Sequence, residues 1–133
     1  MEENTNKKKI LIVDDDKFLV DMYSLKFNES DYQVETAQSG DEAVKLLEEG
    51  LVPDVYLVDV VMPGMDGFEL VGKIKEKFNG HCGAIIILSN LGQKEDVEKG
   101  LSLGADGYIV KASATPTEVV NKVKEILSNR RYV

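Results

Sequence analysis

The stretch "ILIVDDDKF", residues 10–18, sets an apolar run directly against three consecutive acids, Asp14, Asp15 and Asp16. A wholly apolar, β-branched run of this length is typical of a strand that is buried on both faces of a parallel sheet. The acids then stand at the carboxyl end of that strand, where open α/β sheets bind their ligands. Carboxylates packed this closely raise one another's pKa unless a cation neutralises them. The stretch therefore predicts a central parallel strand with a cation site at its end.

Four more short apolar runs follow, and each run is succeeded by a longer stretch with helical periodicity. The five predicted strands are "KILIV" (9–13), "YQVETA" (32–37), "DVYLVDV" (54–60), "AIIILS" (84–89) and "DGYIV" (106–110). Strands that alternate with helices imply right-handed crossovers and a parallel sheet with helices on both faces. We therefore predict an α/β fold, a single domain with a doubly wound, five-stranded parallel sheet.

Helix starts are marked by the spacing of a capping box, in which an N-cap oxygen and a carboxylate three residues later each accept from the other's backbone N–H. The pairs with this spacing are Ser39 with Glu42, Asp66 with Glu69, and Thr115 with Glu118, the last followed by Pro116 at a first helical position. Asp16 directly precedes a helical pattern and is more simply an N-cap than a metal ligand. These signals predict the starts of four helices.

Length and composition limit the classes of protein that the chain can belong to. With 133 residues, of which 43% are hydrophobic, it has room for one compact domain. We expect this domain at 9–128, between a flexible N-terminal segment at 1–8 and a C-terminal tail at 129–133. The formal charge of −8 argues against direct binding of nucleic acid by this domain.

Cysteine, histidine and apolar runs exclude further classes. Cys82 is the only cysteine and His81 the only histidine, so neither an internal disulfide nor a zinc site with the usual four ligands is expected. The N-terminus is polar, and no run approaches the roughly 18 apolar residues of a membrane span. We expect a soluble, cytoplasmic protein that does not bind membranes.

The predicted strands deliver polar side chains to one edge of the sheet. Asp14 and Asp15 follow the first strand, Asp59 the third, Ser89 the fourth and Lys111 the fifth. Mg²⁺ is usually held by one or two carboxylates, keeps several waters and takes phosphate oxygens as further ligands. Asp14 and Asp15 are therefore candidate ligands of Mg²⁺.

Asp59 can do more than bind a metal, because a carboxylate can attack phosphorus and form an aspartyl phosphate. The transferring group needs its equatorial oxygens neutralised, which a metal and an ammonium can do. We interpret Asp59 as the nucleophile, Lys111 as the phosphoryl clamp and Ser89 as a hydrogen-bond donor to a phosphoryl oxygen. Each residue alone is more often a cap, a turn or a solvated side chain, so the inference depends on their joint occurrence at the strand ends.

These residues resemble the receiver domain of bacterial two-component response regulators over about residues 9–128. The motifs that carry the resemblance are the acid pair after the first strand, "DVYLVDVVMPGMDGFEL" (54–70), "ILSN" (87–90) and "GYIVK" (107–111). The most specific is "VDVVMPGMDG" (58–67). The resemblance implies a flavodoxin-like sheet with strand order 2-1-3-4-5.

The resemblance also implies a role for each site residue. Asp59 would be the phosphorylated residue, and Lys111 would contact its phosphoryl group. Mg²⁺, or Mn²⁺ as a substitute, would be held by Asp14, Asp15, Asp59 and the backbone carbonyl of Val61. The protein would be a signalling switch and not an enzyme with a separate substrate, with self-catalysed phosphotransfer followed by slow autodephosphorylation.

A switch and its partners are implied as well. The Ser89 hydroxyl would move toward the phosphoryl group while the Tyr108 ring turns inward, although a half-buried strand aromatic is the simpler interpretation of Tyr108. The donor would be a sensor histidine kinase, a phosphotransfer protein or a small phosphodonor. Phosphorylation would bias the face of the fourth helix, fifth strand and fifth helix toward a downstream protein, a missing output domain or a homodimer.

Three features depart from the family pattern. Ala112 follows Lys111 where the family commonly has proline, often in cis; because a cis bond to alanine costs about 2.5–4 kcal/mol, we expect a trans bond. Asn90 stands where a small residue is usual, and either its bulk narrows access to the acids or its amide holds a water or a phosphoryl oxygen. Val61 and Leu91 are apolar where polar groups can position an attacking water, which predicts a long-lived phosphorylated form.

Other interpretations stay open at this point. A haloacid-dehalogenase-like phosphatase carries an Asp-x-Asp after its first strand, and Asp14 and Asp16 have that spacing. Against it, Phe18 stands where that family has a small residue, and the turn at 62–63 would be unexplained. A receiver that is never phosphorylated and acts only as a binding module is a second alternative. A nucleotide- or flavin-binding module is disfavoured because the first turn lacks a glycine-rich phosphate cradle.

Overall fold

The computed structural model describes residues 7–130, and its sheet has five strands within that range. The strands are β1 (Lys8–Val13), β2 (Tyr32–Ala37), β3 (Val55–Val58), β4 (Ala84–Ser89) and β5 (Gly107–Val110). They lie in the order β2-β1-β3-β4-β5, and every neighbouring pair is parallel. The predicted α/β fold and its strand order are confirmed.

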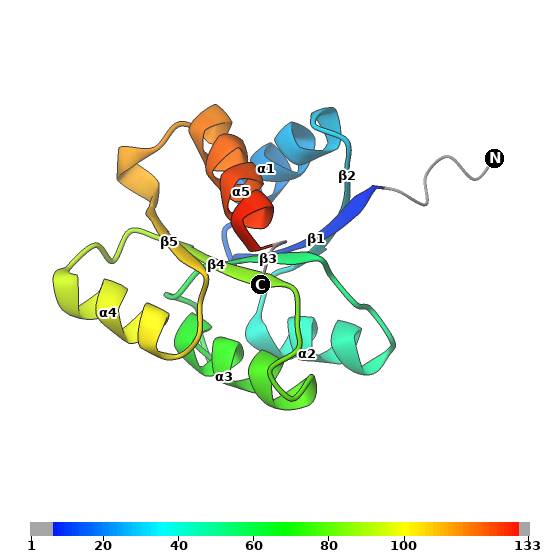
Figure 1. The fold of residues 1–133 in the computed structure, drawn as a ribbon, viewed down its shortest axis with the longest axis vertical. Helices are drawn as coiled ribbons and strands as arrows, with labels where there is room; N and C mark the ends of the chain where they lie inside the picture. Colours follow the sequence, from blue (N-terminus) through cyan, green and yellow to red (C-terminus); the bar gives the residue numbers. More distant parts are fainter. Residues whose placement is uncertain (1–6, 131–133) are drawn as a thin grey trace.

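Helices cover both faces of the sheet (Figure 1). They are α1 (Lys17–Glu29), α2 (Gly40–Glu48), α3 (Gly67–Lys77), α4 (Lys94–Ser102) and α5 (Pro116–Arg130). In Figure 1, α1 and α5 lie on one face, and α2, α3 and α4 lie on the other. A short 3₁₀ turn at Lys111–Ser113, which no sequence pattern predicts, joins β5 to the segment before α5.

The central strands are buried on both faces because successive side chains of a strand point to opposite sides. Ile10 and Ile12 of β1 belong to the apolar cluster that includes Phe27 of α1. Leu11 and Val13 of the same strand belong to the cluster beneath α2 and α3. This two-sided burial explains why "ILIV" is apolar at every position and not only at alternate ones.

Each predicted N-cap accepts its bond, but in the part of the chain that the structure describes the return bond to the cap N–H is absent from two of the three predicted pairs, Ser39–Glu42 and Asp66–Glu69. Thr115 and Glu118 form the complete reciprocal pair, with a 3.1 Å bond to Thr115 Oγ1 and a 2.8 Å bond to Glu118 Oε1. Ser39 caps α2 as predicted, through a 3.0 Å bond from the Glu42 N–H. The Glu42 carboxylate, however, accepts from the N–H of Gln38, one residue before the cap. The Glu42 side chain therefore bonds to the N–H of Gln38 in place of that of Ser39, and it still holds the backbone that leads into α2.

The ends of the domain differ slightly from the predicted limits. β1 begins at Lys8, and α5 continues through Arg130, beyond the predicted end at 128. Arg130 Nε lies 3.3 Å from Asp106 Oδ1, and its Nη2 donates to the Cys82 carbonyl at 3.3 Å, which fixes the last turn of α5. Residues 1–6 of the predicted N-terminal segment and residues 131–133 of the predicted tail lie outside the described residues. Within 7–130, no helix is long and apolar enough to cross a membrane.

Candidate functional site

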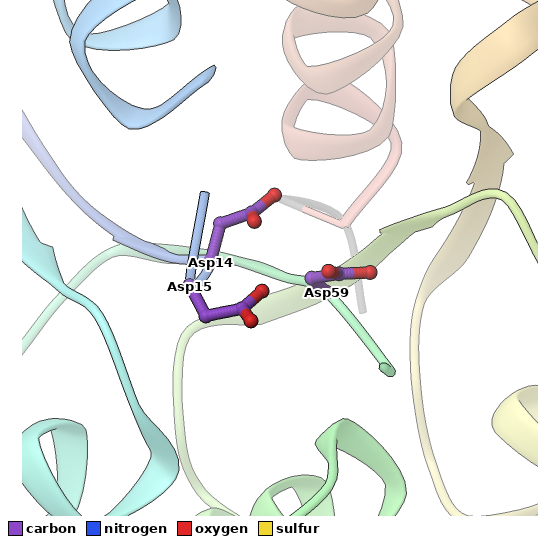
Figure 2. A group of neighbouring side chains, drawn as sticks. All are labelled: Asp14, Asp15 and Asp59. Carbon is purple, nitrogen blue, oxygen red and sulfur yellow. The ribbon is translucent and has the colours of Figure 1, made fainter. Parts of the chain in front are cut away.

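The register of the sheet sets Asp14 and Asp59 side by side. Val13 pairs with Val58, so the residues that follow them leave the two strands at the same level. The Asp59 N–H donates to the Val13 carbonyl at 2.9 Å and extends the ladder by one residue. Carboxylate oxygens of Asp14, Asp15 and Asp59 lie within 4.8 Å of one another. Figure 2 shows the three side chains gathered at the ends of their strands. The structure thus brings together the three predicted metal-binding carboxylates.

Lys111 supplies the positive charge of this cluster. Its Nζ donates to Asp14 Oδ2 at 2.8 Å and lies 3.4 Å from Asp59 Oδ2. The side chains of Asp14, Asp59 and Lys111 are all largely buried, whereas Asp15 is exposed. Three carboxylates against one ammonium leave two negative charges when all groups are ionised. The cluster therefore has the charge and the oxygen donors that suit a hard divalent cation.

Burial and charge shift the pKa values of these groups. Burial raises the pKa of Asp59, and the nearby charge of Asp14 raises it further, while Lys111 acts in the opposite direction. For Lys111, burial lowers the pKa, but the hydrogen bond to Asp14 and the charges of both acids outweigh burial and raise it. Lys111 is consequently held as an ammonium. The raised pKa of Asp59 means that its ionised form is costly here, and a bound cation would lower that cost.

Asp16 has a structural task and does not join the cluster. Its Oδ1 accepts from the N–H groups of Phe18 at 3.0 Å and Leu19 at 3.3 Å, which confirms the predicted N-cap of α1. The Asp16 N–H in turn donates to Asp14 Oδ1 at 2.9 Å and helps to orient that carboxylate. The phosphatase interpretation needs Asp16 as a free acid, whereas two cap bonds to its Oδ1 give it a structural role.

A close backbone approach holds the turn that carries Asp59. The Gly67 N–H donates to the Val60 carbonyl at 2.9 Å, and a Cβ atom on Gly67 would collide with the Asp59 carbonyl oxygen. Asp66 caps α3 beside it, where its Oδ1 accepts from the Glu69 N–H at 2.8 Å. The Asp-Gly pair of "VDVVMPGMDG" therefore lets α3 begin directly against the backbone of Asp59.

The two predicted switch residues are joined through the backbone of Leu91. Ser89 is completely buried at the end of β4, and its Oγ accepts from the Leu91 N–H at 3.2 Å. The Tyr108 hydroxyl donates to the Leu91 carbonyl, and burial raises the pKa of this half-buried tyrosine. Sequence reasoning missed this role of Leu91, because a side-chain pattern carries no signal for a contact made by the main chain.

The positions that depart from the family pattern lie around the site. The apolar side chains of Val61 and Leu91 are 59% and 36% exposed. Asn90 is exposed and lines a groove of about 380 Å³ together with Lys111 and Ala112. Among the described residues no peptide bond is cis, so the expected trans bond between Lys111 and Ala112 is confirmed. The role of the Val61 carbonyl as a metal ligand stays a prediction.

Comparison with known proteins agrees with this geometry. Residues 10–124 match the family model described as the response regulator receiver domain. The chain belongs to this family. It is therefore the receiver domain of a two-component response regulator, as the motifs predict, and receiver domains act as signalling switches.

Relatives of this receiver domain include both longer and similar-sized proteins. It is 37% identical over 126 residues to the transcriptional regulatory protein ResD of Bacillus subtilis (strain 168). The matched region covers 94% of this chain and 50% of ResD. It is 35% identical over 121 residues to the chemotaxis protein CheY of Halobacterium salinarum. That match covers 91% of this chain and 98% of CheY. A CheY-like receiver from Methanospirillum hungatei JF-1 superposes with a TM-score of 0.84 at 31% identity, over 93% of this chain and 96% of that one. The chain thus spans about half of ResD and nearly all of that CheY.

Proposed function

We propose that this receiver domain accepts a phosphoryl group on Asp59 in a reaction that depends on Mg²⁺. The observation that carries the proposal is the setting of Asp59, which is buried within 4.8 Å of two other acids and has the Lys111 ammonium 3.4 Å from its Oδ2. A carboxylate in this position combines a nucleophilic oxygen with groups that can neutralise an incoming phosphoryl group.

The transfer would form a bond between an Asp59 oxygen and phosphorus, while the bond from phosphorus to the donor's histidine nitrogen breaks. Lys111 would neutralise one phosphoryl oxygen, and the Ser89 hydroxyl would donate a hydrogen bond to another. Asp14, Asp15, Asp59 and the Val61 carbonyl would hold the metal. When bound, Mg²⁺, or Mn²⁺ in its place, supplies the charge neutralisation that the phosphoryl oxygens need.

The phosphoryl group would come from a sensor histidine kinase or phosphotransfer protein, or from a small phosphodonor, and we expect the protein to act in the cytoplasm. Movement of Ser89 toward the phosphoryl group would change the bonds of Leu91 and Tyr108. The output would then be a changed face formed by α4, β5 and α5. A downstream protein, an attached output domain or a second copy of the domain would bind that face.

The experiment is intact-mass measurement after incubation with acetyl phosphate and Mg²⁺. Wild type should gain one phosphoryl group, and Asp59→Asn and chelated wild type should gain none. Asp14→Asn should be labelled more slowly, because one metal ligand is lost. Asp31→Asn is the matched control, since Asp31 is an exposed acid in the turn between α1 and β2.

Each other outcome identifies an alternative. Label that survives in Asp59→Asn but is lost in Asp14→Asn would favour the phosphatase interpretation, with Asp14 as nucleophile. A folded wild-type protein that takes no label from acetyl phosphate or from a phosphorylated kinase would instead be a receiver that acts only as a binding module.

A further inference from the structure

α4 is attached to the domain with almost none of its own side chains in the core. Within this helix, all of which the structure describes, Gly100 is the one buried residue. Glycine in a helix interior destabilises the helix relative to alanine. A buried glycine at this position therefore calls for a packing reason.

The ring of Tyr108 provides that reason, because it fills the space that a side chain at position 100 would take. A Cβ atom on Gly100 would lie 3.1 Å from Tyr108 Cδ2 and 3.3 Å from its Cε2. The same atom would lie 2.7 Å from Ile87 Cδ1, so the terminal methyl group of this fully buried side chain would have to shift as well. A rigid aromatic ring moves only as a whole, so Gly100 forms a slot in α4 for the Tyr108 ring.

The Tyr108 ring is connected in turn to the Ser89 hydroxyl. Its hydroxyl donates to the Leu91 carbonyl, and the Leu91 N–H donates to Ser89 Oγ at 3.2 Å. Displacing the ring would remove the hydroxyl from Leu91 and release one end of the segment that holds the Ser89 hydroxyl. The packing of α4 and the order of Ser89 therefore share one chain of contacts.

We propose that Gly100 is a positioning residue for phosphorylation: it keeps the Tyr108 ring beneath α4 and, through Leu91, restricts the positions of the Ser89 hydroxyl. This inference rests on the proposed function of Asp59. A hydroxyl that already has few positions loses less conformational freedom when it moves to the phosphoryl group, so ordering Ser89 speeds the transfer.

A second attachment of α4 makes a local effect of Gly100 testable. Lys99 Nζ lies 4.7 Å from the centroid of the Phe68 ring of α3, in a cation–π contact that does not involve Tyr108. Filling the slot should therefore displace the ring while α4 stays docked through Lys99.

The test compares Gly100→Ala with Gly72→Ala, a matched change inside α3. A Cβ atom on Gly72 would meet nothing within 4 Å, so alanine raises the helix propensity there without a clash. The first readout is the fluorine NMR spectrum of protein labelled with ring-fluorinated tyrosine, with the Tyr108 resonance assigned from Tyr108→Phe. The second readout is the rate at which acetyl phosphate and Mg²⁺ label Asp59.

Gly100→Ala should shift the Tyr108 resonance and slow the labelling by about tenfold, because overpacking displaces the ring. Gly72→Ala should change neither readout, and Gly100→Ala should cause no further slowing in a Tyr108→Ala background. An unmoved Tyr108 resonance, or slowing that persists without the ring, would overturn the proposal. If wild type takes no phosphoryl group, the proposed function fails, and the resonance alone then decides whether Gly100 positions the ring.

Discussion

The Lys111 ammonium lies closer to Asp14 than to Asp59, with its Nζ 2.8 Å from Asp14 Oδ2 and 3.4 Å from Asp59 Oδ2. One cation therefore serves both the predicted metal ligand and the predicted phosphoacceptor. A divalent ion on Asp14 would compete with this hydrogen bond and free the ammonium for a phosphoryl oxygen. The position of Lys111 would thus link metal binding to the proposed phosphorylation of Asp59.

Removing this ammonium should destabilise the folded state. Lys111→Met leaves two buried carboxylates without their shared donor, so we expect the free energy of unfolding to fall by about 2 kcal/mol in urea titrations with chelator. Mg²⁺ should restore part of the loss. Lys122→Met is the control, because Lys122 is exposed and its Nζ lies 3.7 Å from Glu125 Oε1. Such surface ion pairs contribute about 0–1 kcal/mol to the free energy of unfolding. Equal losses in the two variants would contradict the role of Lys111.

Because the pKa of Asp59 is raised in the folded state, ionisation of Asp59 should lower the stability of the protein as pH rises. Burial raises this pKa above 3.8, so between that value and the native pKa the folded state binds more protons than the unfolded state. The contribution of Asp59 to stability therefore falls as pH rises through this window. In chelator, Asp59→Asn should gain stability relative to wild type as pH rises above about 4, and the difference should level off once Asp59 is ionised. Urea unfolding at a series of pH values measures it, and a difference independent of pH would refute the assignment.

Adjacent acids in the same triplet should differ in their effect on metal binding. Asp15 belongs to the carboxylate cluster, whereas Asp16 caps α1. We expect Asp15→Asn to weaken Mg²⁺ binding on the order of tenfold in calorimetric titration, because it removes a ligand. Asp16→Asn removes the same charge but keeps a good N-cap, so its affinity should stay near that of wild type. Equal weakening would mean that overall charge, and not coordination, determines the affinity.

Sequence patterns predict the fold well because they report burial and backbone chemistry directly. The fully apolar run "ILIV" identifies a strand covered on both faces, and the Thr115–Glu118 pair marks the start of α5. The start of α4 carries only part of this signal, because Gln93 stands at its N-cap in place of a preferred cap residue, while the Asp96 carboxylate accepts from the Gln93 N–H at 3.3 Å. Chain order and sheet topology together then bring the acids to one edge.

The details of the site depend on side-chain directions that no sequence pattern reports. Nothing in the sequence indicates that Lys111 lies nearer to Asp14 than to Asp59, or that Tyr108 bonds to the main chain of Leu91. Both contacts join residues far apart in the chain and depend on a choice among rotamers. The 3₁₀ turn at Lys111–Ser113 was likewise not predictable, because Ala112 restricts the backbone far less than a proline at that position would.

The apolar residues at the mouth of the site predict a long-lived phosphorylated form. Val61 is 59% exposed beside the Asp59 turn, and its side chain cannot hold a water in line for attack on phosphorus. Val61→Asn would add an amide that can position such a water, so the half-life of the phosphorylated form after donor removal should shorten by about tenfold. This effect is smaller than the rate factor of about 10²–10⁴ that a general base contributes. Val52→Asn is the matched control, because Val52 is 61% exposed in the loop before β3 and should leave the half-life unchanged. The decay is followed by intact mass; an unchanged half-life in Val61→Asn, or a wild-type half-life among the shortest of receiver domains, would count against this role of the apolar mouth.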